Sequence, residues 1–228
     1  MKLYKDADEL LKRELPPRIT SQIYPLFVAG NVAYNQITNN QKYKNIFHSE
    51  LFPNARAHLM NFLICRQFEQ DMLKTSFPFD ARILKVNNFG RKNIELFKEN
   101  IVIHIAKAKD EDSLPSRSGY RESYSYLNRF LEKQLMFSCD DIKNISVDSE
   151  PYYIFLTYGG KDNTIDFVNL IVPNAGMTNI LKKVNLKESL SLFKFSEESI
   201  AKTEEKNITK LKKEVIKKLN LDAEGENK

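Results

Sequence analysis

The segment from Asp110 to Arg129 contains the residue types that bind anions. Three arginines are interleaved there with three tyrosines, and the segment also contains five serines: Arg117, Arg121, Arg129, Tyr120, Tyr124, Tyr126, Ser113, Ser116, Ser118, Ser123 and Ser125. Guanidinium groups donate paired hydrogen bonds to phosphate oxygens, and tyrosine rings offer stacking surfaces for unpaired bases. If a helix begins near Ser118, its free N–H groups would lie beside Arg117 and Arg121. The segment therefore predicts an anion site.

The acidic start of the same segment supports a second interpretation. Asp110, Glu111 and Asp112 precede the arginines directly. Their carboxylates would neutralise the guanidinium groups, and Ser118 would then be an ordinary helix cap. The residue types alone leave both interpretations open.

A second concentration of positive charge lies at residues 81–109. The chain has 35 Lys and Arg against 30 Asp and Glu, a net charge of +5. This stretch alone has seven basic residues and two acidic ones, which is also +5, so the rest of the chain is neutral overall. The basic residues are Arg82, Lys85, Arg91, Lys92, Lys98, Lys107 and Lys109. A basic β-meander predicts contact with the phosphate backbone of DNA or RNA, although edge strands also carry lysine to prevent edge pairing.

One catalytic arrangement has a partial match in this meander. A Mg²⁺-dependent nuclease of the restriction-endonuclease type needs an acid on one strand and an acid-x-Lys on the next. Asp80 precedes the first strand, and Lys107 lies late in the third. Ile105 occupies the position where the second acid should be, so Glu95 would have to supply it. Asp80, Glu95 and Lys107 form the alternative catalytic set.

Other cofactor and catalytic patterns are missing from the sequence. His48, His58 and His104 are scattered without metal-ligand spacing, and the sequence contains no phosphate loop and no nucleophile elbow. Two cysteines are too few for a disulfide framework. We therefore expect no cofactor and no metal. The N-terminus lacks the apolar core of a signal peptide and no run is long enough to span a membrane, so we expect a cytoplasmic protein.

The elements that must position these residues change type along the chain. Helical periodicity occurs at 8–15, 20–36, 53–73 and 120–137. Strand-like runs occur at 82–87, 94–97, 101–108, 151–158 and 164–172, the last two joined as a hairpin. A short helix is expected at 178–184.

These elements predict an α+β fold with an antiparallel sheet of about five strands. Residues 1–77 form the helical N-terminal lobe, and 78–196 form the α+β core of the same globular unit. Residues 197–228 form a charged helical tail with a thin apolar stripe of Ile208, Leu211, Val215 and Leu219.

Three stretches of the core carry a resemblance to a known family. They are Ile101–Lys109, the Leu114-Pro-Ser…Tyr120-Arg segment and Ile165–Pro173. Over about residues 55–185 the chain resembles an uncharacterised family of small proteins from Gram-positive bacteria and their mobile elements. The resemblance implies no activity and no functional residue, but it suggests a role in phage–host conflict or gene regulation.

The leading hypothesis is a non-enzymatic intracellular protein that contacts nucleic acid through the meander and the 117–129 segment. Its expected anion-binding residues are Arg82, Lys85, Arg91, Lys92, Lys107, Lys109, Arg117, Tyr120, Arg121 and Arg129. The alternatives are the Mg²⁺-dependent nuclease and a protein-binding inhibitor or regulator of a host or phage enzyme. The tail helix would serve for docking or homo-oligomerisation.

Overall fold

The computed structural model describes residues 3–47, 49–50, 53–86, 92–133, 150–161 and 164–191. The expected tail helix and the end of the expected 120–137 helix lie outside these residues. Within the described part, no helix is both long enough and apolar enough to cross a membrane.

A six-stranded mixed sheet forms the centre of the fold. Its strands are β1 (Asp80–Lys85), β2 (Lys92–Lys98), β3 (Ile101–Lys107), β4 (Tyr152–Gly159), β5 (Phe167–Pro173) and β6 (Ile180–Asn185). They follow one another across the sheet in chain order. All neighbouring strands are antiparallel except β3 and β4, which are parallel. The expected α+β class is confirmed, with six strands instead of five and with one parallel pair.

Helices precede the sheet, as the sequence predicts. They are α1 (Ala7–Glu14), α2 (Pro17–Thr38), α3 (Lys44–Phe47) and α4 (Pro53–Arg66), and a short α7 (Leu186–Ser191) follows the sheet. Asp6 caps α1 by accepting a hydrogen bond from the Glu9 N–H at 2.8 Å. Pro17 begins α2, where the missing N–H has no helical partner to lose.

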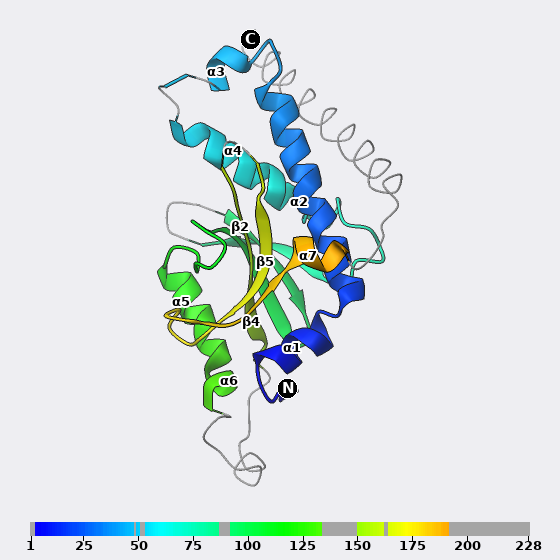
Figure 1. Cartoon of the computed structure of the whole chain (residues 1–228), viewed down its shortest axis with the longest axis vertical. Coiled ribbons are helices and arrows are strands. Elements are labelled where there is room, and N and C mark those ends of the chain that lie inside the picture. Colours follow the sequence, from blue (N-terminus) through cyan, green and yellow to red (C-terminus); the bar gives the residue numbers. More distant parts are fainter. Residues whose placement is uncertain are drawn as a thin grey trace, which may run out of the picture.

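The sheet is covered on both faces (Figure 1). On one face, α1, α2 and α4 pack against residues such as Ile103 and Leu156. On the other face, Val102, Tyr153 and Phe155 form a smaller apolar cluster, against which Leu127 of the β3–β4 crossover packs. The predicted hairpin of β4 and β5 is confirmed, and every residue of the two strands is buried because they are central and covered on both faces.

The crossover between β3 and β4 passes over the second face and breaks into short pieces. It contains α5 (Gly119–Ser125), a 3₁₀ turn (Tyr126–Asn128) and α6 (Arg129–Lys133). The buried Asn128 amide donates to the carbonyls of Tyr153 and Pro173, each at 2.8 Å, and its oxygen accepts from the Tyr153 N–H at 2.9 Å. These bonds hold the crossover on the sheet where a continuous helix was expected.

Two local predictions are wrong. Residues 180–185 form the edge strand β6 and not a helix, because pairing with β5 supplies backbone partners that a short isolated helix lacks. The helical spacing of Phe62 with Leu59 and Leu63 predicts that it lies on the apolar side of its helix, but Phe62 is 53% exposed. The buried side of α4 is instead formed by Met60, Leu63 and Ile64.

Candidate anion-binding site

A cavity of about 390 Å³ lies at the carboxyl ends of the parallel strands β3 and β4. Its walls come from α4, from the ends of β2, β3 and β4, and from the loop that enters α5. The lining residues are Ala57, His58, Asn61, Val86, Lys92, Asn93, Ile105, Lys107, Ser116, Arg117, Ser118, Tyr120, Arg121 and Tyr158. We call this the basic cavity. Ligands of sheets with parallel strands commonly bind at this end of the strands.

Four cationic side chains from three separate segments line the basic cavity. Lys92 begins β2, Lys107 ends β3, and Arg117 and Arg121 flank the start of α5. No aspartate or glutamate is among the described residues that line it. Lys85 is also the direct cross-strand partner of Lys92. Like charges in such pairs repel, so this edge is a favourable place for an anion.

The two arginines are held by carbonyl oxygens. Arg117 donates to the Gly176 carbonyl, and Arg121 donates to the Ser116 carbonyl at 2.7 Å. Arg121 also donates through Nε to the Tyr120 hydroxyl at 3.0 Å. A carbonyl fixes a guanidinium without cancelling its charge, so both arginines keep their positive charge.

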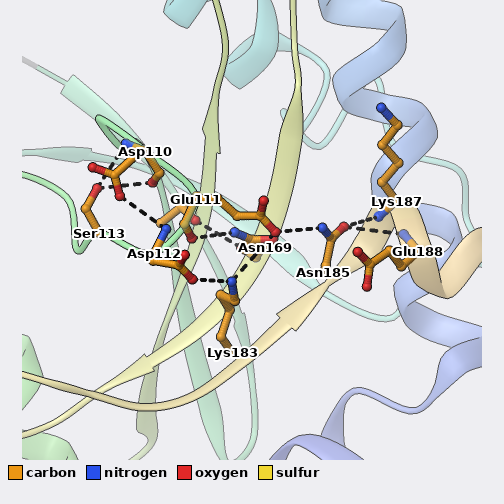
Figure 2. A network of polar contacts seen from close by, with 10 residues as sticks. Asp110, Glu111, Asp112, Ser113, Asn169, Lys183, Asn185, Lys187 and Glu188 are labelled. Atoms are coloured by element: carbon orange, nitrogen blue, oxygen red, sulfur yellow. Dashed lines mark hydrogen bonds and ion pairs between the residues drawn. The ribbon is translucent and has the colours of Figure 1, made fainter.

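The acids that precede these arginines make other contacts (Figure 2). Asp112 pairs with Lys183 of β6 at 2.5 Å, and Glu111 accepts from the Asn185 amide at 2.9 Å. The Asn169 amide of β5 donates to the Glu111 carbonyl at 2.9 Å. Glu111 and Asp112 are thus bound to side chains of β5 and β6, whereas Asp110 is hydrogen-bonded within its own loop.

Neutral polar groups complete the cavity wall. The Tyr158 hydroxyl donates to Asn61 of α4 at 3.1 Å, and burial raises the pKa of Tyr158. The Asn93 amide lies 3.4 Å from the Tyr120 hydroxyl. Ser118 occupies the N-cap position of α5, but its hydroxyl makes no capping bond. Its Oγ is buried and has no hydrogen-bond partner among the described residues, which leaves a donor beside the cavity.

A second polar cluster lies on the face of the sheet that α5 covers. Arg82, Glu95 and His104 are cross-strand neighbours on β1, β2 and β3. Arg82 Nε donates to Glu95 at 2.5 Å, the other Glu95 oxygen lies 2.9 Å from His104 Nε2, and His104 Nδ1 lies 3.0 Å from the Tyr153 hydroxyl. We call these four residues the Glu95 cluster. A carboxylate only accepts, so Nε2 donates to Glu95 and the neutral ring accepts from Tyr153.

The environment shifts both central groups of the Glu95 cluster toward lower pKa values. Burial alone would raise the pKa of Glu95, but hydrogen bonds from His104, Tyr124 and Arg82 outweigh it and lower that pKa. Burial lowers the pKa of His104 against the opposing effect of Glu95. The stable form of the pair is therefore a carboxylate beside a neutral imidazole.

The structure does not bring the three residues of the alternative nuclease set together. Glu95 faces the same side of the sheet as His104, whereas Lys107, three residues farther along β3, faces the other side. Glu95 is fully buried and already bonded to Arg82 and His104. Asp80 is at the exposed start of β1. The described residues contain no cluster of three or more His, Cys, Asp or Glu able to hold a metal.

The ten residues expected to bind anions fall into three groups. Lys92, Lys107, Arg117, Tyr120 and Arg121 meet in the basic cavity. Arg82 is paired with Glu95, and Arg129 is paired with Glu150 at 2.9 Å. Lys85 and Lys109 are exposed near the cavity strands, and Arg91 lies outside the described residues.

Sequence reasoning missed the contribution of α4 to this site. His58 and Asn61 share the cavity with the strand ends although nothing near them in the sequence signals a ligand. Only the packing of the N-terminal helices on the sheet places them there. Searches of protein families, of curated proteins and of solved structures found no match for this chain.

Proposed function

We propose that this protein binds nucleic acid by receiving phosphate in the basic cavity. The observation that carries the proposal is the convergence of four cations from three segments on one hollow whose described lining has no acid. Cations with no local acidic partner raise the free energy of the free protein by mutual repulsion, and a phosphate relieves it. The Glu95 cluster has no such need, because its charges are mutually satisfied.

The test is a salt series of DNA and RNA binding with two matched double variants. Lys92→Gln with Lys107→Gln removes two cavity charges. Lys5→Gln with Lys74→Gln removes the same charge from exposed positions that do not line the cavity. Each phosphate contact contributes about 0.7 to 0.9 to the logarithmic salt slope, so the cavity variant is expected to lose between about 1 and 2.

The control variant is expected to keep the slope of the wild-type protein. Equal losses in the two variants would show that only net charge matters and would refute the cavity as the site. Absence of binding by the wild-type protein at low salt would overturn the function itself.

A further inference from the structure

We propose that the basic cavity holds the terminal phosphate at the end of a nucleic-acid strand and not an internal phosphodiester. This inference rests on the proposed function and specifies its ligand. An internal phosphodiester carries one negative charge, whereas a terminal phosphomonoester carries between about 1.5 and 2 negative charges at neutral pH and three strong acceptor oxygens.

The charge of the cavity fits the more highly charged group. Lys92, Lys107, Arg117 and Arg121 meet in a single hollow and are not spaced along an open track. The arginines that would extend such a track, Arg82 and Arg129, are each ion-paired. Among the described arginines of the meander and the 117–129 segment, Arg117 and Arg121 have no ion pair, and both line the cavity, where one dianionic group can contact the two guanidinium groups.

Ser118 supplies a hydrogen-bond donor for a third oxygen. Its Oγ is buried in the cavity wall and has no partner among the described residues. A buried hydroxyl without a partner costs free energy, and a bound phosphate oxygen would remove that cost. The neighbouring Arg117 and the nearby Arg121 supply donors to the same space.

An exposed aromatic ring beside the cavity indicates that the phosphate is carried on a base-containing molecule. Phe62 is 53% exposed and lies four residues after His58, so the two side chains are neighbours on one side of α4. His58 lines the cavity, and Phe62 lies one helical turn beyond it on α4. An exposed aromatic side chain at this distance offers a stacking surface for the terminal base.

The experiment compares oligonucleotides of one sequence that bear a 5′-phosphate, a 3′-phosphate or hydroxyls at both ends. We expect one phosphorylated form to bind at least about tenfold more tightly than the hydroxyl form. Ser118→Ala should reduce this preference without lowering Tm, because its hydroxyl makes no capping bond. Phe62→Ala should weaken binding of every oligonucleotide and leave the preference intact.

The outcomes separate this inference from the proposed function. Equal binding of the phosphorylated and hydroxyl forms, with the expected salt slope, would overturn the end-phosphate inference and leave nucleic-acid binding standing. Binding of a nucleoside monophosphate as tightly as the phosphorylated strand would show that no strand is required and would also overturn it. Binding of inorganic phosphate but of no oligonucleotide would refute both.

Discussion

The basic cavity and the Glu95 cluster draw their charges from the same strands but use them in opposite ways. Arg82 of β1 and Lys92 of β2 are both basic, yet the pleat sends them to opposite faces. On one face Arg82 meets a buried carboxylate and a histidine. On the other face Lys92 pairs with Lys85 across the strands and lines the basic cavity with Lys107, and the two arginines reach that cavity from the start of α5. A basic meander is thus divided by strand alternation into a structural half and a half suited to binding.

The largest expected effect is the removal of the central carboxylate of the Glu95 cluster. Glu95→Ala leaves the buried His104 without its partner and frees Arg82, and loss of one member of a buried pair costs about 3 kcal/mol. Urea unfolding would measure the change in the free energy of unfolding. Glu99→Ala, at an exposed turn residue of the same strand pair, is the control and should change little.

If Glu95→Ala changes the free energy of unfolding only slightly, the Glu95 cluster is no more important for folding than the basic cavity. In that case the contrast between a structural half and a binding half would fail. A folded Glu95→Ala variant that still binds nucleic acid would support the division into a structural half and a binding half, because Glu95 does not line the cavity.

The pH dependence of stability should come from the Glu95 cluster. In the folded protein the pKa of His104 lies below its ordinary 6.5 and the pKa of Glu95 lies below its ordinary 4.5. The unfolded chain therefore binds more protons, and the free energy of unfolding should fall as the pH decreases, first below 6.5 because of His104 and then below 4.5 because of Glu95.

His104→Gln should flatten the first part of this pH profile, because it removes the group that the unfolded chain protonates first. His58→Gln, which removes an exposed imidazole, is the matched control. A ring titration followed by NMR is a second measurement. A His104 pKa above 6.5 would contradict the neutral imidazole inferred from its burial.

The sequence predicted the local pieces of the site better than their assembly. Charge counting found Lys92 and Lys107, and the Arg–Tyr alternation found Arg117, Tyr120 and Arg121, because side-chain type is a local property. Arg82 and Lys92 lie on opposite faces of the sheet because of the strand register, and a short run of basic residues does not determine that register. His58 and Asn61 line the cavity because of the way α4 packs, and no local sequence pattern predicts that packing.

The same limit explains the errors in the fold. The parallel pairing of β3 and β4 requires a crossover connection between them. The sequence of that connection has the pattern of one long helix, but the structure has α5, a 3₁₀ turn and α6 there. The short run Ile180–Asn185 reads as helix or strand, and pairing with β5 decides it.

The smallest expected effect is on the acidic residues that precede the arginines. Asp112 is 83% exposed and pairs with Lys183, and exposed ion pairs contribute little, so Asp112→Asn should leave Tm almost unchanged. Because this carboxylate is bound to β6, its removal should also leave the nucleic-acid affinity and the salt slope unchanged.

If the acids instead neutralised Arg117 and Arg121, Asp112→Asn would tighten binding. Lys183→Gln is the control, since it breaks the same pair from the other side. If Asp112→Asn binds nucleic acid more tightly and Lys183→Gln does not, the acidic residues act on the basic cavity. The acidic residues and the cavity would then not be separate charged regions.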